Sequence, residues 1–212
     1  MAKPTAPLLS FDARGQIAKT QVYASWRGRS YVRRYTIPAN PKTSGQVSTR
    51  SVFTWLQEAW KLLDSTCQAP WIAAAKGKPV TDRNLWTKFN LPSLRPATSL
   101  ATMQFSPGVG GMFPPTAVAQ ATPIVAGSTT ISFTAPDLPD GWTLTGVRVC
   151  ALPEQDPHMD TDYVSYTAES ATSPITLAGL PGTEYYGGVW AFGTKPDGTV
   201  VYSPGTTIHL TD

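Results

Sequence analysis

The stretch that decides the fold runs from Ser25 to Leu63 and reads SWRGRSYVRRYTIPANPKTSGQVSTRSVFTWLQEAWKLL. Its first part places basic and aromatic side chains on alternating positions, which is typical of a β-strand with two different faces. Two prolines then interrupt the chain, and apolar residues recur at helical spacing as far as Leu63. The stretch therefore predicts a short β-sheet followed by one long amphipathic helix.

The flanking residues extend this prediction in both directions. A turn around Gly15 and a basic turn after Trp26 separate three strands of a small meander. Thr43 or Ser44 can cap the long helix, and two shorter helices follow it. The expected strands span residues 8–11, 17–25 and 31–37, and the expected helices span residues 44–63, 69–76 and 81–91, the last one stopped by Pro92. The expected core-facing stripe of the long helix is Val52, Phe53, Leu56, Ala59, Trp60 and Leu63.

From residue 124 onward, short apolar segments alternate with turn residues, which predicts an antiparallel β-sandwich. Its expected strands span residues 129–134, 144–151, 162–166, 174–177, 185–194 and 200–210. The fold class is thus an α+β domain, a small β-meander plus three helices, followed by an all-β sandwich. The expected boundaries are 1–94 for the first domain, 95–122 for a Pro/Gly-rich connector and 123–212 for the sandwich. Part of the connector should lie against a domain or a neighbouring subunit, because it contains the apolar residues Met103, Phe105, Met112 and Phe113.

Charge is distributed very unevenly along the chain. Residues 1–95 contain fifteen Lys and Arg and four acids, a net +11, whereas residues 96–212 contain two Lys and Arg and ten acids, a net −8. Such an asymmetry concerns partners rather than fold. It indicates two domains with different neighbours.

Cysteine usage and hydropathy limit the compartment. Cys67 and Cys150 fall in different predicted domains, so we expect buried free thiols rather than a bridge. No apolar run approaches the roughly 20 residues that span a bilayer. The opening MAKPTAPLLS lacks the apolar core of a secretory signal, so we expect the protein to be made and used without such export, away from any membrane.

The last part of the chain resembles a fibronectin type III module. The residues that carry the likeness are Leu177, Leu180, Gly182 and Tyr185, at the spacing of that family's corner between two strands. The resemblance covers residues 122–212 and implies an Ig-like sandwich in which the tyrosine hydroxyl bonds back to the main chain. Two features depart from the family: Phe133 stands where a tryptophan is common, and there is no Arg-Gly-Asp. Such sandwiches mostly serve as spacers and binding surfaces.

The first domain resembles a family of short phage and prophage proteins. Spacing and order agree over most of residues 15–91. The matching residues are Trp26-Arg-Gly-Arg-Ser-Tyr-Val-Arg33, Asn40-Pro-Lys-Thr43, Gln46, Arg50, Phe53, Trp60, Trp71, Ala74 and Leu85-Trp-Thr-Lys-Phe-Asn90. The resemblance implies a virion or virion-assembly protein, made in the bacterial host cytoplasm. Its expected partners are other virion proteins, such as a major capsid protein or neck and tail subunits, with several copies of this chain in the particle.

A basic and aromatic cluster is the candidate partner-binding site. It consists of Trp26, Arg27, Arg29, Tyr31, Arg33, Arg34, Tyr35 and Arg50. Arg, Trp and Tyr are enriched at protein interface hot spots, which makes a protein partner the first interpretation. The second interpretation is a nucleic-acid partner, because the cations could contact phosphates and the aromatic rings could stack on bases. No recognised nucleic-acid motif accompanies the cluster, however. A solvated face without a partner is the third.

Catalytic patterns are missing from the sequence. The two histidines, His158 and His209, both lie in the predicted sandwich, and His158 sits in a polar loop over residues 154–162. That loop has carboxylates that could bind a cation, but it lacks the ligand spacing of an EF-hand and the Cys/His pattern of a zinc site. The preferred interpretation is therefore a solvated surface loop. Tryptophans 55, 60, 71 and 86 are expected in the core. We expect no enzyme activity, no cofactor and no bound metal.

These observations leave several functions open. The first hypothesis is a phage virion structural protein, most specifically a capsid-associated cement or decoration protein that docks through its basic domain and projects the acidic sandwich. A neck or tail component is the alternative within that class. The second hypothesis is a nucleic-acid-binding protein that acts through the segment Trp26 to Tyr35. A carbohydrate- or cell-binding module using Trp142, Tyr163 and Tyr186 ranks last.

Overall fold

The basic segment Arg29–Arg34 forms the last strand of a small antiparallel sheet. The computed structural model describes residues 14–26, 29–37, 39–159 and 163–212. The sheet has the order β1-β2-β3, with bounds Gly15–Ile17, Gln21–Trp26 and Arg29–Arg34. A small meander is present, as expected, but with different bounds: a turn over residues 18–20 divides the strand expected over residues 17–25, and Gly15, expected in a turn, begins β1. The strand expected over residues 8–11 lies outside the described residues.

Three helices follow the sheet, as the sequence predicts. They are α1 (Ser44–Leu62), α2 (Ser65–Ala75) and α3 (Asp82–Leu94). The carboxylate of Asp64 caps α2: it accepts from the Thr66 hydroxyl and from Thr66 N, and these two bonds lower the pKa of Asp64. Pro92 does not stop α3, because a proline in the last turn removes only one ladder bond. No helix among the described residues is long and apolar enough to cross a membrane.

The long helix buries a stripe slightly different from the predicted one. Phe53 was expected in the core but is 47% exposed, whereas Trp55 is buried. The indole Nε1 of Trp55 donates to Gln155 Oε1 at 2.9 Å, so its polar atom is satisfied inside the protein. The core position expected for Trp55 is thus confirmed, whereas the one expected for Phe53 is wrong.

Nine further strands form two antiparallel sheets. One sheet has the order β4-β11-β10-β7-β8, with β12 also paired to β10, and the other has the order β5-β6-β9. Both β11 and β12 pair with the long strand β10, one after the other. The bounds are β4 Pro107–Val109, β5 Thr116–Val125, β6 Ser128–Thr134, β7 Thr143–Pro153, β8 Tyr166–Ser170, β9 Ile175–Ala178, β10 Glu184–Thr194, β11 Val200–Pro204 and β12 Thr206–Thr211. The expected strand over residues 162–166 is thus displaced to β8, and β5 starts inside the expected connector.

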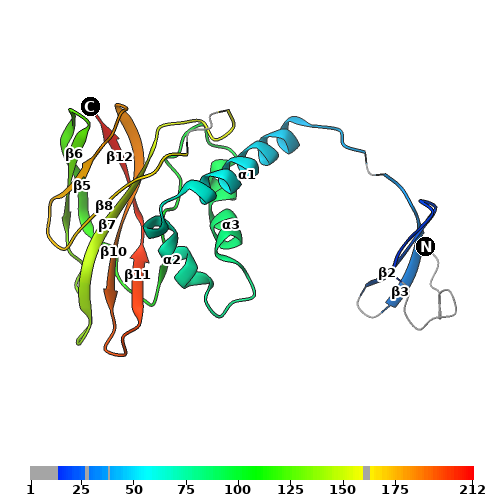
Figure 1. Cartoon of the computed structure of the whole chain (residues 1–212), viewed down its shortest axis with the longest axis horizontal. Helices are drawn as coiled ribbons and strands as arrows, with labels where there is room; N and C mark the ends of the chain where they lie inside the picture. The colour runs from blue at the N-terminus through cyan, green and yellow to red at the C-terminus, as the bar shows by residue number, and fades with distance from the viewer. Residues whose placement is uncertain (1–13, 27–28, 38, 160–162) are drawn as a thin grey trace. The chain divides into compact units, whose positions relative to one another are not determined.

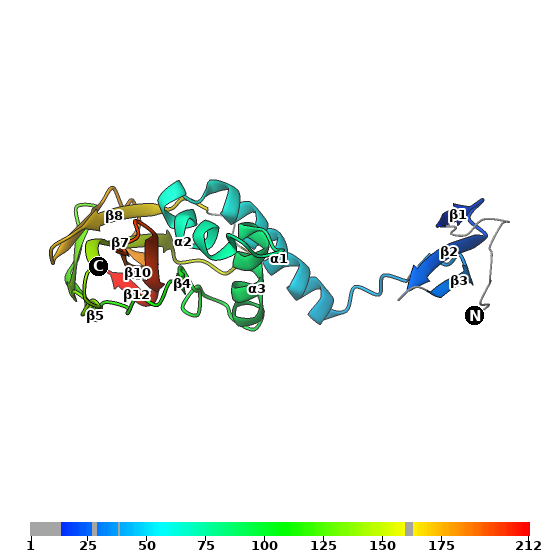
Figure 2. The ribbon, with the colours of Figure 1, turned by 90° about the horizontal axis from the view of Figure 1, so that it is seen from below.

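The six-stranded sheet is covered on both faces. On β7, Val149 faces the three-stranded sheet, whereas Cys150 and Leu152 belong to the core that the helices share. On β10, Val189 likewise faces the three-stranded sheet, and Trp190 belongs to the core shared with the helices. Figures 1 and 2 show the helices packed on one side of this sheet, with β5 and β6 on the other. The result is a layered unit of sheet, sheet and helices.

This packing corrects the expected domain boundaries. The chain divides between Lys42 and Thr43, so that residues 1–42 form one unit and residues 43–212 form the other. We call them the hairpin unit and the layered unit. The helices had been assigned to the meander, but they pack on the sheet because its outer face is apolar and needs a cover. No domain boundary falls near residue 94.

A disulfide bond joins the helical layer to the sheet, which corrects the expectation of free thiols. Cys67 in α2 is bonded to Cys150 in β7, with their Cα atoms 6.2 Å apart. The expectation of free thiols assumed that the two residues lay in different domains. Because α2 packs directly on β7, the two residues meet inside one core.

The connector is ordered and lies against the layered unit. Met103, Phe105 and Met112 are buried, as expected for residues that pack on a domain, whereas Phe113 is exposed. Asn90 of α3 fixes the connector: Gln104 N donates to Asn90 Oδ1 at 2.7 Å, and Asn90 Nδ2 donates to Gln104 O at 3.1 Å. A Cβ added to Gly188 would lie 2.3 Å from Phe105 Cβ, so only glycine admits this contact.

The corner before β10 has the predicted hydrogen bond. Gly182 N donates to the hydroxyl oxygen of Tyr185 at 2.6 Å, and Tyr185 itself is fully buried. On another edge, the side-chain amide of Gln120 bonds both main-chain groups of Thr211, which ties β5 to β12. The first contact fixes the turn before β10, and the second joins one sheet to the other.

The disulfide predicts a measurable contribution to stability. Replacing Cys67 and Cys150 by serine, or reducing the wild type, should lower the free energy of unfolding by about 3 to 5 kcal/mol, because the bond closes a loop of 83 residues in the unfolded chain. Chemical denaturation with and without reductant measures the difference. The idea is wrong if the unfolded, unreduced protein reacts with two equivalents of a thiol reagent.

Gly188 supplies a second test of how the helical layer packs. Gly188→Ala should destabilise the protein by about 1 to 3 kcal/mol, because the new methyl group overlaps Phe105. Gly45→Ala is the matched control: its Cβ meets nothing within 4 Å, and alanine in α1 should stabilise by about 0.5 to 1 kcal/mol. Equal melting curves for the two variants would contradict this packing.

Candidate functional site

The register of the hairpin unit sorts the candidate residues onto two faces. Residues directly opposite each other in an antiparallel pair share a face, and neighbours along a strand alternate. Trp26 pairs with Arg29, Ala24 with Tyr31, and Val22 with Arg33. These six side chains therefore share one face, which we call the Trp26 face, and Arg34 lies on the opposite face.

The Trp26 face has an apolar row beside a cationic row. The β2 row is Val22, Ala24 and Trp26, and the β3 row is Arg29, Tyr31 and Arg33. Tyr35 lies two residues after Arg33, just beyond β3, and so continues the same row. Its N–H donates to Thr20 O at 2.8 Å. The structure thus brings five predicted residues to one side of the sheet.

Exposure distinguishes this unit from the rest of the chain. None of the described residues between 14 and 42 is buried, and Trp26 is 65% exposed. The sequence has no Asp or Glu between Asp12 and Glu58, so no carboxylate in the described part of the unit balances its cations. The charge of the described part of the unit therefore suits a partner that supplies negative charge.

Two of the predicted residues are not brought to this face. Arg27 lies outside the described residues. Arg50 lies on α1, in the layered unit, so the structure does not assign it to the same surface. The sequence-based cluster is therefore a face of β2 and β3 rather than one continuous set.

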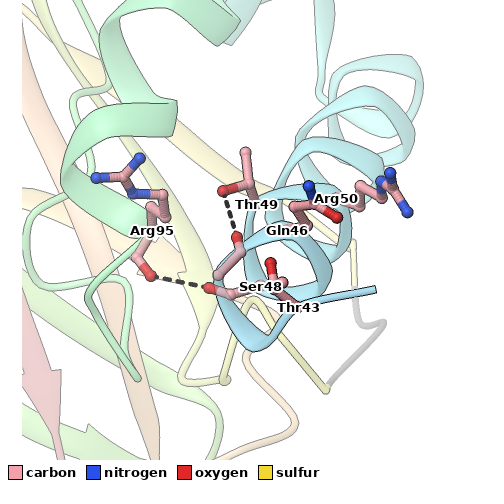
Figure 3. A pocket seen from close by; sticks show the side chains of 7 residues that line it. Thr43, Gln46, Ser48, Thr49, Arg50 and Arg95 are labelled. Atoms are coloured by element: carbon pink, nitrogen blue, oxygen red, sulfur yellow. Dashed lines mark hydrogen bonds between the residues drawn. The ribbon is translucent and has the colours of Figure 1, made fainter. Parts of the chain in front are cut away.

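Arg50 instead lines an open pocket at the start of α1. The pocket has a volume of about 670 Å³, and its lining residues are Thr43, Gly45, Gln46, Ser48, Thr49, Arg50 and Arg95. Figure 3 shows the guanidinium groups of Arg50 and Arg95 pointing away from each other. Because the two cations do not converge, this arrangement offers no defined anion site.

A larger groove lies between α2 and β11. Its volume is about 910 Å³, and Ile72, Val200 and Tyr202 contribute apolar surface to it. Lys76, Asp82 and Asp197 stand among its lining residues. Sequence reasoning did not find this groove, because its walls come from segments more than 100 residues apart that meet only through the packing of α2 on the sheet.

The acidic loop considered as a cation site is attached to α1. Nδ1 of His158 lies 3.2 Å from Ser51 Oγ and 3.4 Å from Ser48 Oγ, and His158 N donates to Asp156 Oδ1 at 2.8 Å. Asp160 and Asp162 of this loop lie outside the described residues. The described residues contain no group of three His, Cys, Asp or Glu side chains that could hold a metal ion.

The second histidine belongs to a pair across two strands. His209 of β12 is opposite Tyr186 of β10, with stacked rings whose centroids are 4.5 Å apart, and His209 Nε2 lies 2.7 Å from Glu184 Oε1. Burial raises the pKa of the Tyr186 hydroxyl, and the nearby Glu154 carboxylate adds to this effect. The arrangement is a side-chain ladder that supports the sheet.

Comparison with models of known protein families finds no match, and comparison with curated protein sequences finds none either. The functional argument therefore depends on the residues and their geometry.

The exposure of Trp26 gives a direct test of this surface. Five other tryptophans are at most 8% exposed, and Trp142 is half-buried beneath the Lys195 ammonium, 4.8 Å from its ring centroid. Trp26→Phe should therefore remove most of the tryptophan emission that iodide quenches. Trp142→Phe is the matched control and should remove much less. An unchanged quenching slope for Trp26→Phe would show that Trp26 is covered in solution.

Proposed function

We propose that this chain is a structural protein of a phage virion. In this proposal the hairpin unit docks on the particle and carries the acidic layered unit, most specifically as a capsid-associated cement or decoration protein. The observation that carries the proposal is the hairpin unit itself. It is a regular sheet without one buried residue in its described part, and it presents arginines and aromatics. A sheet of this size needs another layer to pack against.

The charge distribution supports docking through the hairpin unit. Drawn at the observed boundary, residues 1–42 contain eight Lys and Arg and one acid, a net +7. Residues 43–212 contain nine Lys and Arg and thirteen acids, a net −4. Because one unit of the chain is basic and the other acidic, a negatively charged surface would attract the first and repel the second, which favours a single orientation of the protein.

The layered unit fits the role of a presented module. We propose that its two sheets form a fibronectin type III-like sandwich. The order β5-β6-β9 against β8-β7-β10-β11 supports this, as does the bond from Gly182 N to the Tyr185 hydroxyl. The helical layer on the outer face is an addition to such a sandwich. The disulfide also agrees with a particle that meets oxidising surroundings after release from its host.

A nucleic-acid partner is the second candidate function. Trp26 and Tyr31 lie on the same face as Arg29 and Arg33, and stacking rings beside cations are the elements of a single-strand binding sheet. Such binding has a steep dependence on salt, because phosphate contacts release counterions. Retention of the full chain on DNA across a salt series tests it.

The proposed function predicts that the protein is part of the particle. Particles of the phage or prophage that encodes this chain are purified by density gradient, and the protein is quantified against the major capsid subunit. We expect a fixed ratio that persists at moderate salt, and labelled antibodies should bind over the capsid rather than at the neck or tail. Label at the neck or tail would favour that alternative location. Protein that is abundant in the lysate but missing from the particles would overturn the proposal.

A further inference from the structure

We infer that the Trp26 face of the hairpin unit is the docking surface, and that its partner is a carboxylate-rich protein surface of another virion subunit. This inference rests on the proposed function and adds to it the face, the partner chemistry and the residues. It starts from the absence of any buried residue in the described part of the hairpin unit. A three-stranded sheet gains stability when one of its faces is covered.

The two faces of the sheet differ in what they offer a partner. The Trp26 face combines Trp26, Tyr31 and two arginines with the small apolar residues of β2. On the opposite face, Ser25 pairs with Ser30 and Tyr23 with Val32, and the only arginine contributed by β2 or β3 is Arg34. Trp, Tyr and Arg dominate the binding energy of protein interfaces, and serine contributes little. The Trp26 face is therefore the one suited to a partner.

The arrangement along the strands defines the chemistry of that partner. Arg29, Tyr31 and Arg33 follow one another at intervals of about 6.8 Å, the repeat of one face of a strand. Each guanidinium can donate two parallel hydrogen bonds to one carboxylate. The parallel row of Val22, Ala24 and Trp26 gains nothing from phosphates, because it contributes apolar contact and no charge. A protein surface with an apolar ridge beside carboxylates complements both rows along their length. A nucleic acid would use the arginines and stack on Trp26 and Tyr31, but it would leave Val22 and Ala24 without a partner.

Two neighbouring arginines provide a matched pair of variants. Arg33 and Arg34 are both exposed in β3, carry the same charge and point to opposite faces. Arg33→Ala and Arg34→Ala therefore remove the same charge from the same strand but from different surfaces. Trp26→Ala removes the most exposed aromatic side chain of the docking face.

The experiment measures retention of the full chain on purified particles from which the protein has been stripped, across a salt series. We expect Trp26→Ala and Arg33→Ala to weaken binding at least tenfold, as hot-spot truncations do, and Arg34→Ala to change it less than twofold. Arg33→Lys keeps the charge but not the two parallel hydrogen bonds, so it should fall between Arg33→Ala and wild type. Hydrogen exchange in β2 and β3 of the free variants shows whether each one keeps the hairpin.

Each other result overturns part of the account. Equal losses for Arg33→Ala and Arg34→Ala, with wild type still bound, would reject the face while leaving the virion role intact. Wild type that is not retained on particles at any salt concentration would reject both. Strong retention on double-stranded or single-stranded DNA, weakened equally by both alanine variants, would show that the hairpin unit binds the phosphate backbone of DNA instead.

Discussion

The layered unit depends on one constraint, which is that its central sheet is apolar on both faces. Val149 and Val189 face the second sheet, whereas Cys150 and Trp190 face the helices. A sheet of this kind is stable only when both sides are covered. The three helices provide the second cover, and the bond between Cys67 and Cys150 makes that cover covalent.

That constraint also determines how the bulky residues of the three helices are used. The bulky residues of α1, α2 and α3 are used by the sheet and by each other: Trp71 and Trp86, for example, pack edge to face with ring centroids 5.4 Å apart. The indole of Trp71 also donates to Phe105 O at 2.9 Å, which holds the connector in the same core. These side chains therefore belong to the core of the layered unit.

The sequence was informative wherever a pattern is local. Strand alternation predicted β3 and most of β2, and capping residues predicted the Thr81 cap of α3. The start of α1 was also predicted, although Thr43 makes no side-chain cap bond there. The bond from Gly182 N to the Tyr185 hydroxyl was expected from the resemblance to a fibronectin type III module. The boundary between units and the disulfide did not follow, because both depend on which long-range face the helices cover. The sequence did contain one indication of the buried sheet. Neither the odd nor the even positions carry many polar residues in Val147 to Leu152 and Tyr185 to Gly193, as expected for strands buried on both sides.

The candidate site was predictable in composition but not in geometry. The sequence identified Trp26, Tyr31 and the arginines as candidates. Because side chains alternate along a strand, it also predicted that Arg33 and Arg34 lie on opposite faces. It did not show that Val22 and Ala24 complete the same face, because that depends on the pairing register of β2 with β3. It also grouped Arg50 with this cluster, although Arg50 belongs to the layered unit.

The central claim is that the hairpin unit docks while the layered unit keeps its own closed core. Hydrogen–deuterium exchange of the full chain, free and bound to particles, tests it most directly. The account predicts that binding slows exchange in β2 and β3 and leaves the strands and helices of residues 43–212 unchanged. Protection that appears in the layered unit, with β2 and β3 unaffected, would contradict it.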